Sequence, residues 1–199
     1  MAKDKKTKSK IRKRFRLFAS ISEKRKSTLL KYTGWAITAF TLYTLVSVGS
    51  YLFTWKADQS LLTSPDMMDQ AVEVQNWGGK LGYDLSHFFV SECFGLASLV
   101  LVFLLGFISY RMIFWKKSLG TFRIVCLSVS ATFILSMLLS YGSSLFSDDV
   151  VFGGGLGGDA GAAVIAWLKN LFGNIPVLFI LLLIVVVFLS FLFVFYILY

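Results

Sequence analysis

The sequence predicts an all-α integral membrane protein with four transmembrane helices and both ends of the chain in the cytoplasm. Three observations lead to this fold class. Hydrophobic residues make up 56% of the 199 residues, which lies outside the usual range for a soluble domain. Four long stretches of the chain are apolar and free of charge near their middles. Most of the basic residues behind the net charge of +9 precede the first of these stretches.

Residues 1–33 form the basic start of the chain, which we expect in the cytoplasm. Ile11, Phe15 and Phe18 recur at helical spacing among the basic residues, so residues 11–31 predict an amphipathic helix on an anionic lipid surface. Residues 1–10 are expected to be a disordered tail. The alternative is contact with nucleic-acid phosphates, which would be nonspecific because the segment contains no element that reads bases. The basic residues expected at the lipid surface are Arg12, Lys13, Arg14, Arg16, Lys24, Arg25 and Lys26.

The membrane domain is expected over residues 34–199, and its first span over residues 34–55. This stretch has 22 residues without charge, enough to cover about 33 Å as a helix. Trp35 and Trp55 lie at its two ends, where tryptophan is typical of a membrane interface. A cleaved signal peptide is a poor alternative because the apolar region is too long and no small-x-small cleavage site follows it.

The second span is predicted over residues 94–115, after a polar outer loop and a glycine-opened lead-in at residues 76–95. The outer loop holds Asp58, Asp66, Asp69 and Glu73. The turn after the span is basic from Arg111 to Arg123 and contains no acidic residue. The positive-inside rule therefore places this turn in the cytoplasm.

The third span is predicted over residues 124–146, and an acidic, glycine-rich outer loop follows it. Residues 160–172 then predict a short apolar helix, with Asp159 as its N-cap and Gly173 at its end. Its 13 residues are too few to cross a bilayer. We expect this helix to lie in the outer interface or to dip back into the membrane.

The last span is predicted over residues 177–199 and carries no charge. Together the charges predict both ends of the chain on the inner side. An inner-membrane protein usually continues past its last span into a basic cytoplasmic segment. We therefore expect the chain to be the amino-terminal piece of a longer protein.

Motifs for catalysis, nucleotide binding and metal binding are weak or absent. Residues 155–160, GLGGDA, fit G-x-G-x-x-A, but they lead into a membrane helix and not into a βαβ unit. No G-x-x-x-x-G-K-[ST] motif occurs. His87 lies near Asp84 and Glu92, but no second His or Cys completes a metal-binding face, and we expect His87 to bond Asp84. We predict no catalytic, cofactor-binding or metal residues in this segment.

The span middles contain no ionisable residue, because Glu92 and Arg111 both lie near span ends. An ion or proton path needs polar groups at depth, so this pattern disfavours one. The pattern does not exclude a channel that uses a hydrophobic gate or a selectivity filter of backbone carbonyls. A small polytopic transporter or channel subunit is therefore kept as the alternative function.

Glycines four positions apart predict close helix contacts. The lead-in contains Gly78 and Gly82, and for this pair packing and turn formation are both open. The second loop contains two further pairs, but Gly153 to Gly155 are expected to form a turn. Along the lead-in helix, the expected packing side consists of Leu81, Leu85 and Phe88 or Phe89.

The order of these motifs resembles a known family. Asn76-x-Gly78-Gly79-x-x-Gly82, followed by Phe94-Gly95 at the head of the second span, resembles the membrane-anchor domain of the FtsK/SpoIIIE DNA translocases. The second loop, before its short helix and final span, is similar as well. The residues expected to pack or to contact partners are Asn76, Gly78, Gly79, Gly82, Phe94, Gly95, Gly154, Gly155 and Gly158.

The resemblance implies a function for the domain and a further domain after Tyr199. A linker and a RecA-like ATPase would follow, which uses ATP and Mg²⁺, is hexameric in the family, and pumps chromosomal DNA through the closing septum. The membrane domain would be a noncatalytic anchor in the bacterial cytoplasmic membrane at the septum, and it would localise the motor and help it assemble. Expected partners are the lipid bilayer, further copies of the chain and other division proteins, with DNA bound only by the motor.

Overall fold

The computed structural model describes residues 2–59, 73–114, 120–146 and 151–197. Within these ranges all regular elements are helices and none is a strand. In chain order they are α1 (Ala2–Asp58), α2 (Gly79–His87), the π-helix η2 (Phe88–Cys93), the 3-10 turn η3 (Gly95–Ala97), α3 (Ser98–Ile113), α4 (Thr121–Phe146), α5 (Gly158–Phe172) and α6 (Asn174–Ile197).

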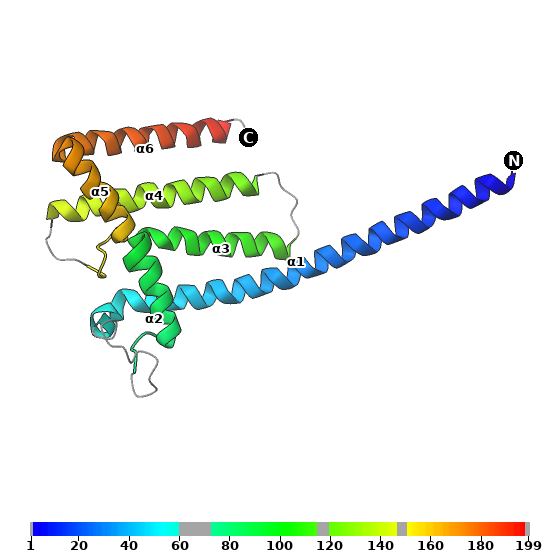
Figure 1. The fold of residues 1–199 in the computed structure, drawn as a ribbon, viewed down its shortest axis with the longest axis horizontal. Coiled ribbons are helices and arrows are strands. Elements are labelled where there is room, and N and C mark those ends of the chain that lie inside the picture. The colour runs from blue at the N-terminus through cyan, green and yellow to red at the C-terminus, as the bar shows by residue number, and fades with distance from the viewer. Residues whose placement is uncertain (1, 60–72, 115–119, 147–150, 198–199) are drawn as a thin grey trace.

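Four of these helical stretches are long and apolar enough to cross a membrane, which confirms the predicted all-helical, four-span fold. They are Arg25–Asp58, Gly95–Ile113, Thr121–Phe146 and Asn174–Val194. Figure 1 shows the spans side by side in one row, with α2 near α1 and α5 near α4 and α6, both at the same ends of the spans. The chain is therefore a multi-pass membrane protein, and its orientation across the membrane stays a prediction.

Helix α1 differs from the expected start of the chain. It runs without a break from Ala2 to Asp58, so residues 2–10 are helical and the expected disordered tail is not found. The physical reason is composition: no Gly or Pro precedes Gly34, and Lys and Arg are good helix formers. The basic segment continues the axis of the first span and extends beyond the row (Figure 1). It would have to bend to lie flat on a lipid surface.

The short helix α5 begins and ends close to the predicted positions. Gly173 ends it with φ +85°, as expected for a glycine stop. The N-cap is Gly157 and makes no side-chain bond, so the prediction of Asp159 as N-cap is wrong. Asp159 lies in the first turn, where its charge is favourable next to the helix dipole.

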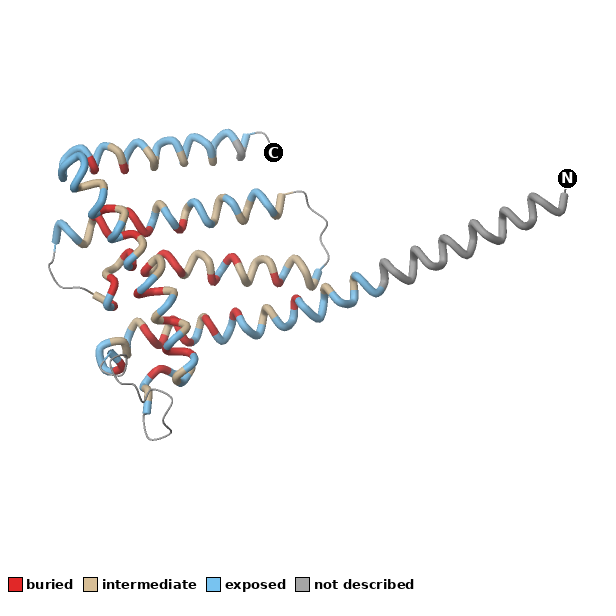
Figure 2. The backbone as a smooth tube through the Cα atoms, viewed as in Figure 1, coloured by how far each residue is buried: buried red, intermediate tan, exposed pale blue. Residues whose placement is uncertain are grey.

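Buried residues gather where the short helices cross the spans (Figure 2). One core cluster contains Val48, Tyr51, Tyr83, Val90 and Phe152. A second cluster joins α4, α5 and α6 through Met137, Tyr141, Ile165, Val177 and Leu181. Most of the remaining surface of α6 is apolar and exposed, as expected for a helix facing lipid.

Candidate contact site at the glycine turns

The crossing helices α2 and α5 both begin with the sequence Gly-Gly-x-x-Gly. We call residues 76–82 the first glycine turn and residues 156–161 the second glycine turn. The first lies against α1 and the second against α4. Each contact therefore joins a crossing helix to the span that precedes it in the chain.

In the first glycine turn, Gly78 and Gly82 lie directly on Ser47 of α1. A Cβ added to Gly82 would come within 2.6 Å of the Ser47 Oγ, and one added to Gly78 would overlap the same atom. Contacts this close exclude any larger side chain unless Ser47 moves. Of the two readings left open for this pair, the structure therefore supports packing.

Asn76 fixes the first glycine turn in place. Its Nδ2 donates to the Ser47 carbonyl at 3.0 Å, and its Oδ1 accepts from the Gly78 N–H at 2.8 Å. The side chain is 3% exposed, so both bonds are shielded from water. Buried amides need such partners, since an unpaired one costs about 1–3 kcal/mol.

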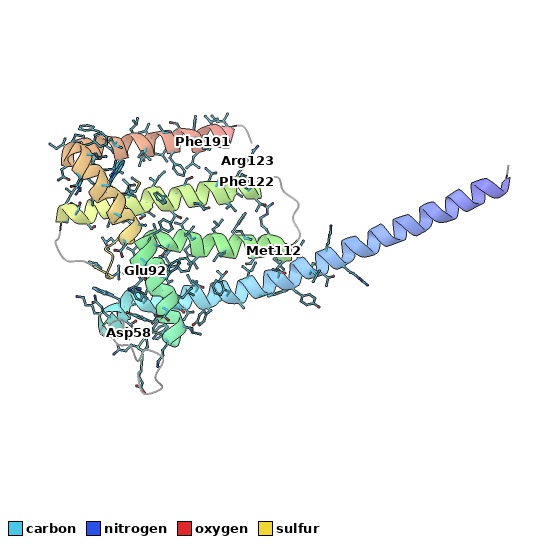
Figure 3. All side chains as sticks on the ribbon, viewed as in Figure 1. Asp58, Glu92, Met112, Phe122, Arg123 and Phe191 are labelled. Atoms are coloured by element: carbon cyan, nitrogen blue, oxygen red, sulfur yellow. The ribbon has the colours of Figure 1, made fainter. Side chains whose placement is uncertain are left out.

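Further groups of α1 bind the same turn. The Tyr43 hydroxyl donates to the Gly78 carbonyl at 2.8 Å, and the Trp77 N–H donates to Ser50 Oγ at 3.0 Å. At the end of α1, Asp58 accepts a bond from the Gln75 N–H at 2.8 Å. Figure 3 shows Asp58 at this end of the molecule. One face of α1 therefore binds the chain from residue 75 to residue 82.

The expected packing side of α2 is found only in part, because Leu85 and Phe89 are half-buried but the fully buried face is a different one. Leu81 is 71% exposed and Phe88 is 50% exposed, whereas Gly82, Tyr83 and Ser86 are buried. Small residues let two helix backbones approach closely, which is why Gly82 and Ser86 face α1, with Tyr83 packed beside them in the core cluster.

In the second glycine turn, Gly157 and Gly161 lie on Ser136 and Ser140 of α4. A Cβ on Gly161 would come within 2.6 Å of the Ser140 Oγ, and one on Gly157 would overlap both serines. The Ser136 hydroxyl donates to the Gly157 carbonyl at 2.6 Å. Sequence reasoning noticed the glycine pair but missed the serines, which share its four-residue spacing and could have indicated the partner helix.

Gly95 and Gly158 join the two halves of the chain. The Leu96 N–H donates to the Leu156 carbonyl at 2.9 Å. A Cβ on Gly158 would lie 2.5 Å from the Cys93 carbonyl and from the Gly95 nitrogen. Gly95 and Gly158 have φ values of +64° and +73°, which other residues rarely adopt. Both steric room and backbone conformation therefore require glycine here.

The remaining predicted contact residues divide into two groups. Gly79 and Gly155 have φ values of +66° and +82° and open space where a Cβ would stand, so glycine is needed there for the turn and not for close packing within the chain. Gly154 lies in a turn, as expected, and it also lies against the Ser91 carbonyl. Phe94 packs edge-on against Phe133 of α4, with ring centroids 5.6 Å apart.

The predicted lipid-contacting residues all belong to the basic part of α1. Arg25 and Lys26 are exposed. The side chains of Arg12, Lys13, Arg14, Arg16 and Lys24 lie outside the described residues.

His87 pairs with Glu92 and not with Asp84. Its Nδ1 lies 3.5 Å from a Glu92 carboxylate oxygen, and its ring contacts Tyr51 and Tyr83. The pair spans five residues because η2 is a π-helix, which brings positions i and i+5 together. Figure 3 shows Glu92 near the ends of the spans at which the short helices cross. Within the described ranges no three His, Cys, Asp or Glu side chains form a group that could hold a metal.

Burial shapes the ionisation of the groups near this pair. Desolvation, with smaller contributions from Asp58 and Asp84, raises the pKa of Tyr83 to about 12. Burial and the neighbouring Glu92 also raise the pKa of the Cys93 thiol. Both groups therefore stay neutral at physiological pH and act as packing residues.

A comparison with known families decides what kind of domain carries this geometry. The family model for the 4TM region of DNA translocase FtsK/SpoIIIE matches residues 27–198. The chain belongs to this family. No curated protein and no solved structure matches the sequence.

The match identifies the chain as the noncatalytic membrane domain of an FtsK/SpoIIIE translocase, as the glycine motifs predicted. It begins inside α1, so most of the basic segment lies outside the matched part of the 4TM region. Both glycine turns lie within it. The contacts that hold the short helices to the spans therefore belong to the family domain itself.

Proposed function

We propose that this 4TM region anchors a cytoplasmic, ATP-driven DNA translocase in the bacterial cytoplasmic membrane at the division septum, and helps its subunits to assemble. The observation that supports the proposal is the family match, which reaches into all four candidate spans. DNA, ATP and Mg²⁺ would bind only to the motor domain. The partners of the 4TM region would be lipid, other division proteins and further copies of itself.

The motor domain is tested by reading the same frame beyond Tyr199. We expect a linker and then a RecA-like core with a Walker A lysine, which places phosphates and Mg²⁺. A reading frame that closes without such a core would contradict the proposal.

The anchoring role is tested by septal localisation in dividing cells. The variant Gly82→Trp places a large ring on Ser47 and should reduce localisation while the protein still inserts. Leu81→Trp is the matched control, because Leu81 is the adjacent residue and is 71% exposed. Unchanged localisation of Gly82→Trp would count against a role of this contact in placing the motor.

The basic segment of α1 supports attachment to anionic lipid. Arg25 and Lys26 are exposed, and each basic residue near a negative leaflet contributes about 1 kcal/mol. Replacing the seven basic residues between Arg12 and Lys26 by Gln should weaken protection of this segment from protease in membranes that contain anionic lipid. Equal protection of both proteins would exclude lipid contact.

The transporter alternative gains no support from the buried hydroxyls of the spans. Thr44 donates to the Phe40 carbonyl at 2.9 Å, and Thr132 donates to the Ser128 carbonyl at 2.8 Å. These two threonine hydroxyls bond carbonyls of their own helices, whereas the buried Ser47 and Ser140 hydroxyls lie against the glycine turns. Solute or ion flux through liposomes that contain the purified protein would revive this alternative.

A further inference from the structure

The two halves of the chain repeat one pattern. Each half has a span, then Gly-Gly-x-x-Gly at the start of a crossing helix, then Phe-Gly and a second span. The backbone repeats too. Gly78 and Gly157 are N-caps with φ −80° and −96°, and the next glycines, Gly79 and Gly158, have φ +66° and +73°.

The crossing helices end alike, with a difference of one residue. Phe94-Gly95 ends the first and Phe172-Gly173 the second, and both glycines have positive φ, +64° and +85°. Phe94 follows Gly82 by 12 positions, whereas Phe172 follows Gly161 by 11. The π-helix η2 occurs only in the longer of the two, and a π-turn is the usual way a helix takes up an added residue.

Buried serines continue the correspondence. Ser47 lies on Gly78 and Gly82, and Ser140 lies on Gly157 and Gly161. Both Oγ atoms are buried without a hydrogen-bond partner among the described residues. The same group thus meets the same glycine spacing in both halves.

The end of the first half binds the start of the second, a contact we call the repeat joint. It consists of Gly95 and Leu96 on one side and residues 156–158 on the other. Its central bond is the one from the Leu96 N–H to the Leu156 carbonyl, at 2.9 Å. Each side of the joint has a counterpart elsewhere in the repeat.

Both counterpart surfaces are exposed, and among the described residues no other segment of the chain covers them. Trp77 corresponds to Leu156 and is 82% exposed, and Gly79, which corresponds to Gly158, has nothing within 4 Å of an added Cβ. Gly173 corresponds to Gly95 and has equally open space, and Asn174, which corresponds to Leu96, is exposed. These two surfaces lie at opposite edges of the row of spans, on α2 and between α5 and α6 (Figure 1). Each edge therefore presents one side of a repeat joint.

We propose that the 4TM region binds a second copy of itself head to tail, with residues 77–79 of one copy seated on Gly173 and Asn174 of the next. The contact reproduces the repeat joint between chains. Helix α6 then lies beside the neighbour's α1, as α3 lies beside α4 within one chain, and its exposed apolar surface is covered in part. A head-to-tail contact uses two different surfaces, so it builds rings or open rows and not two-fold dimers.

Cysteine cross-linking in native membranes tests this contact. In a background of Cys93→Ser and Cys126→Ser, one chain carries both Trp77→Cys and Asn174→Cys. Two residues that are joined in the same way as Leu96 and Leu156 have their Cα atoms within the roughly 7 Å that a disulfide requires. Oxidation should therefore give a ladder of species larger than the dimer. Chains with one substitution each, expressed together with different tags, should give only mixed dimers.

Matched pairs keep the test decisive. Leu96→Cys with Leu156→Cys should form a disulfide within one chain. Phe53→Cys with Asn174→Cys should give no ladder, because Phe53 is 90% exposed but does not belong to residues 77–79, on which Asn174 is proposed to sit. Cross-linking of either single variant with itself would indicate a two-fold contact and overturn the proposal. A yield no higher than that of the Phe53 pair would also overturn it, and failure of the intrachain pair would remove the repeat joint on which it rests.

The proposal rests on the repeat, although it would supply the assembly step of the proposed function. The two can fail separately. Septal localisation without cross-linking would retain the anchor and reject the contact. Cross-linking without septal localisation would retain the contact and reject the anchor.

Discussion

Helices α2 and α5 cross their neighbouring spans through the same glycine spacing, yet different groups hold them. The first glycine turn is bound by side chains: Asn76 bonds both Ser47 and Gly78, and Tyr43 and Ser50 add further bonds. Among the described residues, the second has a single side-chain bond from α4, from Ser136 to Gly157, and relies on close backbone contact. Glycine spacing thus sets where two helices approach, and the surrounding polar residues decide how strongly each contact depends on hydrogen bonds.

The largest effect is expected at the backbone contact between the halves. Gly158→Ala should destabilise the domain by about 3–5 kcal/mol, because the new Cβ meets backbone atoms and the positive φ adds strain. Thermal unfolding in detergent measures this loss. Gly173→Ala is the matched control, since it shares the positive φ but has open space, and it should cost about 1–2 kcal/mol. Equal losses at the two sites would show that steric contact is unimportant at Gly158.

A smaller loss is expected from Gly82→Ala, about 1–3 kcal/mol, because the Ser47 Oγ is a side-chain atom that can move. Adding Ser47→Gly removes the obstructing group and should restore part of the stability. Unfolding of the two single variants and the double variant measures the coupling. Additive losses would mean that Gly82 and Ser47 do not meet.

Asn76→Ala tests whether the first glycine turn depends on a side chain that the second does not have. It removes both bonds of the Asn76 side chain and leaves the Gly78 N–H without this acceptor, so a loss of about 1–3 kcal/mol is expected. Hydrogen exchange should rise in α2 and remain unchanged in α5. The exposed neighbour Trp77→Ala serves as control, and exchange that rises equally in both helices would show that Asn76 is not specific to the first turn.

The smallest effect is expected at Leu81→Ala. Leu81 faces outward from α2, and exposed substitutions usually change stability by no more than about 0.5 kcal/mol. Ser86→Leu, on the buried face of the same helix, should be far more damaging. The reverse order in an unfolding assay would restore the packing side that the apolar pattern predicted.

The sequence predicted the spans and the short helix well, because apolar length and a glycine stop are local signals. It could not predict the π-helix η2, since the extra residue before Phe94 is visible only beside the shorter second half. It also missed Ser47, Ser136 and Ser140, because hydroxyl residues are common in spans and only their contact with glycine distinguishes these. The packing side of α2 was predicted only in part: Leu85 is half-buried, but Leu81 is exposed and the closest contact to α1 is made by Gly82.

The unbroken course of α1 has a structural consequence. Its 57 residues correspond to about 85 Å of helix, nearly three times the thickness of the hydrocarbon core. The basic end and the Ser47 face belong to the same helix. The only helix that binds the first glycine turn among the described residues is thus also the one that carries the charged start of the chain. The contact between Ser47 and the first glycine turn therefore also ties α2 to the helix that carries the charged start of the chain.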